Sequence, residues 1–338
     1  MSTLLKREKS SYSNFKIILL FLLTITVVSA SIILSVSLTV CCLINQNETL
    51  SLLEKNAHKY KHGAVASDQM NCSEIGSQIL KENGTAVDAA IATVFCLGVI
   101  NMHSSGIGGG GVMIVHNPNS NTHISKRSEN FESVVYDYRE VVPKQLETVL
   151  NVSDPKLLAM GGLSIAVPGE IAGLYMAWKD HGKLPWKRLV DPAIKLAREG
   201  FTMHTRLWEA TNFMKSFILS DEGLESLLFI NRTVRPKYSY LKNPELADTL
   251  EKISLDPMSF YDGSLAEDII NDVKNSSGLI TLEDLKNYKV KKRNTIDLEL
   301  GNGLVIRGAP PPFGGIIVEF ILNILQGYNF TNLHFDSD

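Results

Sequence analysis

A long uncharged segment near the amino terminus constrains this chain more than any other feature. From Ile17 to Ile44, 28 consecutive residues carry no charged side chain, whereas about 20 apolar residues are enough to cross a bilayer as a helix. A cleaved signal peptide has an apolar stretch of roughly 7–15 residues, but here strong hydrophobicity continues past the small residues 29–31 to Leu38. The sequence therefore predicts a transmembrane signal anchor at residues 17–44.

The charges before this anchor predict its orientation. Four basic residues, at positions 6, 7, 9 and 16, precede it against a single acid, Glu8, and positively charged flanks stay on the cytoplasmic side. We therefore expect a single-pass type II protein of the plasma membrane with an extracellular ectodomain. The expected parts are a cytoplasmic tail at 1–16, the anchor at 17–44, a stalk at 45–58 and one ectodomain at 59–338.

The glycosylation motif Asn-x-Ser/Thr supports this topology. Every match follows the anchor and none precedes it, as expected of a luminal or extracellular domain. The candidate acceptors are Asn47, Asn71, Asn83, Asn151, Asn231, Asn275 and Asn329.

The chain has four cysteines, too few for a fold built on disulfides, and none stands at a zinc-ligand spacing. Cys41 and Cys42 lie at the outer end of the anchor, where membrane packing or lipidation would explain them. Cys72 and Cys96 are the pair on the oxidising side, where a disulfide can form.

Composition predicts a folded domain and gives no reason to bind nucleic acid. Hydrophobic residues make up 44% of the chain, enough for a sizeable core. The 33 Lys and Arg residues against 36 Asp and Glu residues leave a formal net charge of −3, so no global positive field attracts phosphate backbones.

Hydrophobic periodicity and cap residues predict an α+β ectodomain. Two helices separated by a break at Asn83-Gly84 are expected within 73–100. Further helices are expected at 170–181, 192–200, 205–219, 244–253, 265–274, 282–288 and 315–325. Strands are expected at 112–115, 135–138, 163–167, 295–300 and 304–307.

A glycine cluster, Gly106 to Gly111, lies between a predicted helix and a predicted strand. It formally matches G-x-G-x-x-G, but a dinucleotide site needs strand, loop and then helix, so that the phosphates meet a helix amino terminus. Because the order here is reversed, we expect the glycines to permit close backbone packing and positive φ angles beside a pocket.

Several stretches, taken together and in order, resemble the γ-glutamyltransferases, also called glutathione hydrolases. They resemble in particular the large-subunit portion of the animal membrane-anchored members, from about Lys59 to Phe330. The stretches are Tyr60–Ala66, Gly84–Ala92, His103–Gly110, Ala166–Glu170, His181–Trp186, Pro192–Phe201, Thr281–Leu285 and Gly308–Pro312.

This resemblance implies an amino-terminal-nucleophile hydrolase with a four-layer αββα core, made as a precursor that cleaves itself into two subunits. An amino-terminal threonine of the small subunit attacks the γ-glutamyl carbonyl of glutathione and transfers the acyl group to water or an acceptor amine. The implied partners are glutathione, other γ-glutamyl compounds, the small subunit and the membrane. No metal or organic cofactor is implied.

The resemblance also assigns residues of this chain. Arg139, in Tyr138-Arg139-Glu140, matches the arginine that binds the α-carboxylate of the glutamyl group, and a guanidinium offers the planar fork that such binding uses. From the residues alone, Arg139 could instead pair with a nearby surface acid. The family pattern also pairs the cysteines at positions 72 and 96.

The family's nucleophilic threonine has no counterpart among these 338 residues, because Thr295 and Thr331 stand in unrelated contexts. We therefore expect no catalytic residue in this chain, which resembles a member truncated before the small subunit, and no activity from it alone. The alternative is an inactive membrane glycoprotein that acts by binding. His103 is interpreted as a packing residue, and a metal site at His58 and His62 is not expected.

Overall fold

A computed structural model describes residues 60–117, 133–146 and 161–328. The chain divides into two units, Met1–His62 and Gly63–Asp338, and the fold below is that of the second. The predicted tail, anchor and stalk lie outside the described residues, as do three candidate glycosylation sites, Asn47, Asn151 and Asn329. None of the helices within the described ranges has the length and apolar character needed to cross a bilayer.

The described part is a mixture of helices and antiparallel strands, as the α+β prediction requires. The helices are α2 (Met70–Lys81), α3 (Ala86–Ile100), α5 (Glu170–His181), α6 (Trp186–Glu199), α7 (Thr205–Phe213), α8 (Lys215–Ile218), α9 (Glu222–Leu228), α10 (Pro244–Leu255), α11 (Ser264–Asn275), α12 (Leu282–Lys286) and α13 (Gly315–Leu325). The longer strands are β1 (Gly111–His116), β2 (Ser133–Tyr138), β7 (Lys291–Arg293), β8 (Ile296–Leu300) and β9 (Leu304–Gly308). Short pieces complete the list: β3 (Phe201–Thr202), β4 (Phe229–Ile230), β5 (Thr233–Val234), β6 (Tyr240–Leu241) and the 3₁₀ turns η2 (Gly162–Ser164), η3 (Pro257–Phe260) and η4 (Gly301–Gly303).

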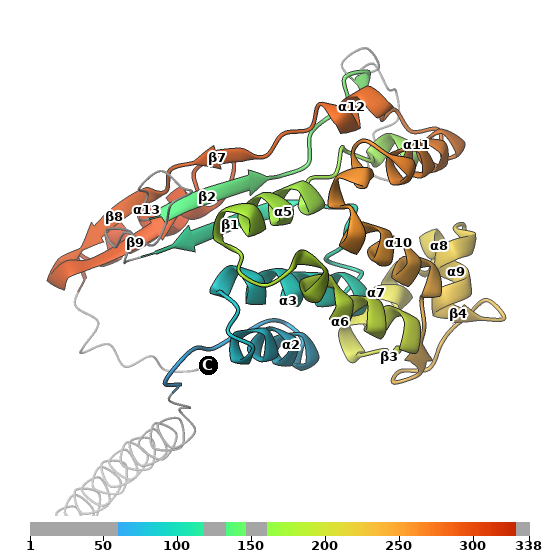
Figure 1. The fold of residues 1–338 in the computed structure, drawn as a ribbon, viewed down its shortest axis with the longest axis horizontal. Helices are drawn as coiled ribbons and strands as arrows, with labels where there is room; N and C mark the ends of the chain where they lie inside the picture. The colour runs from blue at the N-terminus through green and yellow to red at the C-terminus, as the bar shows by residue number, and fades with distance from the viewer. Residues whose placement is uncertain (1–59, 118–132, 147–160, 329–338) are drawn as a thin grey trace, which may run out of the picture. The chain divides into compact units, whose positions relative to one another are not determined.

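A three-stranded antiparallel sheet, in the order β1-β2-β7, supports the region that the sequence marked as functional (Figure 1). Gly111 pairs with Tyr138 at one end of the β1-β2 ladder and His116 pairs with Ser133 at the other. Helix α5 packs against β2, and α13 packs against the separate β8-β9 hairpin. The sheet therefore brings the glycine cluster before β1 next to the residues that follow β2.

Helices α2 and α3 form the first packed pair, as predicted. Thr85 and Asp88 form a reciprocal capping box at the start of α3, which satisfies two backbone N–H groups that the helix itself leaves free. The structure joins Cys72 and Cys96 by a disulfide with their Cα atoms 5.4 Å apart. Both cysteines are fully buried, so the bond links the two helices inside the core.

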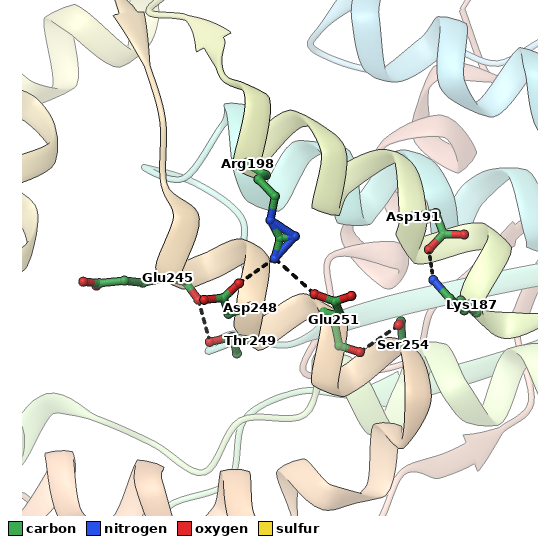
Figure 2. Close-up of polar contacts among 8 residues, drawn as sticks. All are labelled: Lys187, Asp191, Arg198, Glu245, Asp248, Thr249, Glu251 and Ser254. Carbon is green, nitrogen blue, oxygen red and sulfur yellow. Dashed lines mark hydrogen bonds and ion pairs between the residues drawn. The ribbon is translucent and has the colours of Figure 1, made fainter.

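Helices α6 and α10 lie side by side (Figure 2), and α6 also packs against α3. Their buried contact includes Trp186, whose indole N–H donates to the carbonyl of Ile253 at 3.0 Å. At the exposed edge, Arg198 reaches across to Asp248 at 2.5 Å and Glu251 at 3.1 Å. These ion pairs are open to solvent and contribute little to stability, so the apolar contact holds the two helices together.

The structure corrects several sequence predictions. The strand predicted at 163–167 is instead a 3₁₀ turn followed by a single bridge between Val141 and Val167, because Pro168 has no N–H to extend a ladder. The helix predicted from Pro192 begins at Trp186. Its buried residues Trp186, Leu189, Val190 and Ala193 share one face, and this packing outweighs the missing hydrogen bond at the internal proline.

Two further boundaries differ from the prediction. The helix predicted at 205–219 divides at Met214 into α7 and α8. The helix predicted at 282–288 ends at Lys286, although it begins, as expected, after the cap Thr281. Its early end leaves Tyr288 outside the helix, where its hydroxyl reaches the region described next.

Candidate functional site

The glycine turn, defined as Gly106 to Gly111, is held by hydrogen bonds to the start of α5. The carbonyl oxygen of Gly109 accepts from the N–H of Gly169 at 2.8 Å and from the N–H of Glu170 at 3.1 Å. The turn is thus fixed to the Pro168-Gly169-Glu170 segment that the sequence also singled out.

The glycine turn also packs directly on the backbone that follows β2. A Cβ atom added at Gly110 would lie 2.5 Å from the carbonyl oxygen of Tyr138 and 3.0 Å from the nitrogen of Glu140, so no larger residue fits there. This confirms the predicted close backbone packing. The predicted positive φ angles are wrong, because the described glycines with positive φ are Gly161, Gly200 and Gly303, all outside the turn.

Arg139 lies immediately after β2, in the backbone segment that packs against the glycine turn. Its carbonyl oxygen accepts from the hydroxyl of Tyr288 at 2.9 Å, and its N–H donates to Asp137 Oδ1 at 3.3 Å. Asp137 is itself buried and paired with Arg293 at 3.1 Å. The backbone of Arg139 is therefore held from both sides.

The side chain of Arg139 is exposed. Among the described residues it has no hydrogen bond or ion pair partner, so the surface ion pair that the sequence left open is not formed within this part of the chain. A rigid backbone that presents an unpaired guanidinium is suited to bind a carboxylate.

A cleft of about 600 Å³ opens beside the glycine turn. Ile107 and Gly108 line it together with the segment around Ile165 and Pro168, and residues of α10, η3 and α11 complete the lining. The residues that line it are Ile107, Gly108, Ile165, Pro168, Thr249, Lys252, Phe260, Leu265, Asp268, Ile269, Asn271 and Asp272. Arg139 is not among them, so its guanidinium does not line this cleft.

Two stacked tyrosines contact the backbone on both sides of the glycine turn: Tyr261 bonds the start of α5, and Tyr288 bonds Arg139. The rings of Tyr261 and Tyr288 have centroids 5.7 Å apart. Tyr261 donates to the carbonyl of Pro168 at 3.1 Å and accepts from the N–H of Ala172 at 3.1 Å. Burial raises the pKa of both hydroxyls above the usual tyrosine value, so both remain neutral donors. Neither tyrosine was predicted from the sequence to belong to the site.

Glu170 is a third residue of this region that was not predicted to belong to the site. Its side chain is 6% exposed, and burial, with a smaller contribution from the charge of Glu140, raises its pKa to about 8. The available signal was its context, because this acid is followed directly by the apolar run Ile171 to Leu174.

The other residues weighed from the sequence lie outside this arrangement. The ring of His103 lies 5.7 Å from the ring of His204, and burial, with the charges of His204 and Arg206, lowers the pKa of His103. His204 caps α7 and contacts the carbonyl of Ile100 at 3.2 Å. The candidate glycosylation residues Asn71, Asn83, Asn231 and Asn275 are all exposed.

Comparison with known proteins gives a consistent result. The family model for gamma-glutamyltranspeptidase matches residues 72–338. Glutathione hydrolase 3 of Arabidopsis thaliana is 39% identical over 97% of this chain and 50% of that protein. Glutathione hydrolase 7 of Rattus norvegicus is 33% identical over 89% of this chain and 44% of that protein. The chain thus spans about half the length of these relatives.

Solved structures agree with the sequence matches. The crystal structure of Helicobacter pylori gamma-glutamyltranspeptidase has a TM-score of 0.73 and 30% identity, covering 83% of this chain and 80% of that chain. The enzyme from Pseudomonas nitroreducens, complexed with L-DON, has a TM-score of 0.72 at 30% identity, covering 82% and 81%. Sequence, family model and fold together show that this chain belongs to the gamma-glutamyltranspeptidase family.

Proposed function

We propose that this chain is the large-subunit portion of a γ-glutamyltransferase that hydrolyses glutathione and transfers its γ-glutamyl group to water or an amine. Family membership supports the reaction class, and several of the matching relatives are named glutathione hydrolases. In this proposal the chain binds the glutamyl group, whereas the nucleophilic threonine lies on polypeptide outside these 338 residues.

The observation that carries the proposal is the exposed guanidinium of Arg139, which has no partner among the described residues. A free α-carboxylate can accept two parallel, charge-assisted hydrogen bonds from its fork. Tyr288 and Asp137 fix the backbone that presents it, with hydrogen bonds of 2.9 and 3.3 Å. Such preorganisation lowers the entropy lost on binding.

The exposed face of α13 supports a second polypeptide as partner. The buried residue of this helix is an acid, Glu319, whereas its apolar residues are exposed, including Ile317 at 59% and Phe320 at 62%. A helix with this pattern normally has its apolar face covered. We infer that the other half of the enzyme covers it and completes the four-layer αββα core.

We also propose that the protein is a glycosylated type II protein of the plasma membrane with an extracellular ectodomain. The uncharged segment at 17–44, the basic residues before it and the position of every glycosylation motif after it support this topology. Exposure of the four described candidate asparagines is what a glycan acceptor requires.

The decisive experiment isolates the protein from native membranes with an antibody against its ectodomain and assays hydrolysis of a γ-glutamyl anilide. We expect activity to co-purify with a second polypeptide whose first residue is threonine, and the 338-residue chain expressed alone to be inactive. Recovery of a glycoprotein without a partner or activity would support the alternative, a membrane protein that acts by binding. Activity of the chain alone would contradict the assignment of the nucleophile.

A further inference from the structure

Glu170 has a buried oxygen atom that receives no hydrogen bond from the described residues. Its side chain is 6% exposed, and its Oε1 atom is fully buried without a partner among the described residues. An unsatisfied buried carboxylate oxygen is costly and rare in native proteins. Its charge state and its surroundings therefore need a specific explanation.

Three backbone N–H groups at the start of α5 donate to acceptors other than the side chain of Glu170. Free N–H groups in a first helical turn normally favour an anion there. Here the N–H of Gly169 and that of Glu170 donate to the carbonyl of Gly109, and the N–H of Ala172 donates to the hydroxyl of Tyr261. These three N–H groups are thus satisfied by neutral acceptors and not by a carboxylate.

The last turn of α3 lies beside Glu170. Glu170, Gly98 and Val99 line one small cavity. Within the described ranges no N–H or hydroxyl group donates to the carbonyl oxygens of Gly98 and Val99, which belong to the last turn of the helix. Carbonyl oxygens of a last helical turn that lack a donor can accept a hydrogen bond, directly or through water, from a carboxyl group that carries a proton.

The cavity is large enough for one water molecule. The volume open to the centre of a water is about 10 Å³, which is close to the smallest volume that holds one. Its remaining walls are apolar, formed by Phe95, Ile107, Leu246 and Leu250. A single water there can bridge the acid and the helix carbonyls.

We propose that Glu170 is a neutral carboxylic acid at physiological pH, that it donates through one internal water to the last carbonyls of α3, and that this link positions the glycine turn beside Arg139. The glycine turn contacts both Glu170 and the end of α3, which the water would connect. The carbonyl of Gly109 is bonded to the N–H of Glu170, and a Cβ atom added at Gly98 would lie 3.3 Å from the Cα of Gly106. The neutral acid does not depend on the proposed enzymatic function, whereas the effect on Arg139 rests on it.

The groups around Glu170 make the direction of its titration clear. Glu140 contributes a like charge, and Tyr138 and Tyr261 are neutral hydroxyl groups. The packed residues of α3 and α10 that line its cavity do not titrate. Burial raises the pKa of Glu170 to about 8, above its value in an unfolded chain, so its contribution to stability is complete at acidic pH and is lost as pH rises toward 8.

The test compares Glu170→Gln, which is isosteric and stays neutral, with Glu199→Gln as a matched control. The carboxylate of Glu199 lies on the surface, 65% exposed, in an i,i+4 ion pair with Lys195. Thermal midpoints of the full chain, with any polypeptide that co-purifies, are measured from pH 5 to pH 9. We expect the midpoint of the Glu170→Gln chain, relative to wild type, to rise by several degrees between pH 5 and 8 and then to level off. The control should show no such trend.

Infrared difference spectroscopy provides a second readout that does not require activity. The carbonyl band of a protonated carboxyl group should be present in the wild type at pH 7, absent from Glu170→Gln and retained in Glu199→Gln. A Glu140→Gln chain, which lacks the neighbouring charge, should lose this band at a lower pH than wild type. A pH-independent midpoint difference, or a band unaffected by Glu170→Gln, would overturn the neutral acid.

The positioning role is tested through the KM of a γ-glutamyl substrate in the purified enzyme. As pH passes 8, KM should rise more in the wild type and in Glu199→Gln than in Glu170→Gln, with kcat changing less than KM. Equal KM profiles would overturn the link to Arg139. An inactive preparation that still shows the infrared and midpoint effects would contradict the proposed function and leave the neutral acid standing.

Discussion

Arg139 is the residue on which substrate binding depends in the proposed enzyme. Replacing it with alanine removes two charge-assisted hydrogen bonds, worth about 3 kcal/mol together, so KM for glutathione should rise roughly 100-fold. Arg139→Lys keeps the charge but loses the planar fork, and an intermediate increase is expected. Steady-state kinetics of the purified enzyme measure both effects.

A matched arginine serves as control for this experiment. The side chain of Arg206 is 81% exposed and contacts Glu209 at 3.4 Å in an i,i+3 ion pair, so Arg206→Ala should leave KM close to the wild-type value. If Arg139→Ala gave the same KM as Arg206→Ala, the carboxylate assignment would be wrong.

Asp88 is a residue whose loss should damage the fold itself. Its buried carboxylate accepts from the N–H groups of Thr85 at 2.8 Å, Lys183 at 3.0 Å and Leu184 at 3.2 Å. Asp88→Ala leaves these donors without a partner, which should cost about 3 kcal/mol or more. Denaturant unfolding of the ectodomain measures the loss, and Asp88→Asn, which keeps one acceptor oxygen, should cost less. Equal stability of the alanine and wild-type chains would contradict this role.

Residues of the site differ in how far sequence could reveal them. The position of Arg139 followed from a motif, and its unpaired state required the structure. Glu170 and Tyr288 could not be found by spacing, because their partners come from distant segments: Glu170 meets the glycine turn about 60 residues earlier, and Tyr288 bonds Arg139, 149 residues away. Such contacts depend on tertiary packing, which local patterns do not encode.

At the scale of elements, the disulfide between α2 and α3 supports the first helix pair. It closes a loop with a sequence separation of 24 residues, so the loop-entropy model predicts a loss of about 3 kcal/mol when it is removed. Replacing both Cys72 and Cys96 by alanine should lower the thermal midpoint of unfolding. It should not change the substrate binding proposed for Arg139. Adding a reductant to the wild type under denaturing conditions should give the same loss, and an unchanged midpoint would contradict the prediction.

A polar network ties β2 to α5 and β7 three residues before Arg139. The hydroxyl of Tyr136 donates to Asp180 at 2.6 Å and lies 2.8 Å from Nε2 of His181, and Asp180 pairs with Lys292 at 2.7 Å. Tyr136→Phe should cost about 1–2 kcal/mol in unfolding free energy, because two half-buried partners, Asp180 and His181, lose one bond each. Tyr240→Phe alters an exposed tyrosine and should be neutral. Equal unfolding curves would show that the network adds no stability.

Element boundaries were predictable where one local signal decides them. Helix α5 begins directly after Pro168-Gly169 and ends at His181, as predicted. The cap Thr281 marks the start of α12. Prediction was wrong where tertiary packing competes with local chemistry, as in the helix that continues through Pro192 and at the lone bridge of Val167. The two-residue strands β3 to β6 were not predicted, because such short pairs have almost no periodicity.

At the scale of the molecule, the distribution of apolar surface is uneven. The helices around α3 and α6 bury a continuous core, whereas α13 and the adjoining hairpin leave large apolar side chains in water, including Leu304 at 62% and Phe320 at 62%. Burying such surface is worth roughly 25 cal/mol per Å². The described part is therefore expected to gain stability from whatever covers α13.

A charge placed on the exposed apolar face of α13 should weaken binding of the proposed partner. Phe320→Glu puts a carboxylate where the inferred second polypeptide packs, whereas Phe213→Glu makes the same change on α7, at a side chain that is 88% exposed. Because a buried unpaired charge is strongly unfavourable, Phe320→Glu should sharply reduce the partner recovered with the antibody, and Phe213→Glu should not. The free chain carrying Phe320→Glu should remain as stable as the wild-type chain without its partner, since residue 320 is exposed there. Equal recovery for the two variants would place the partner elsewhere on the molecule.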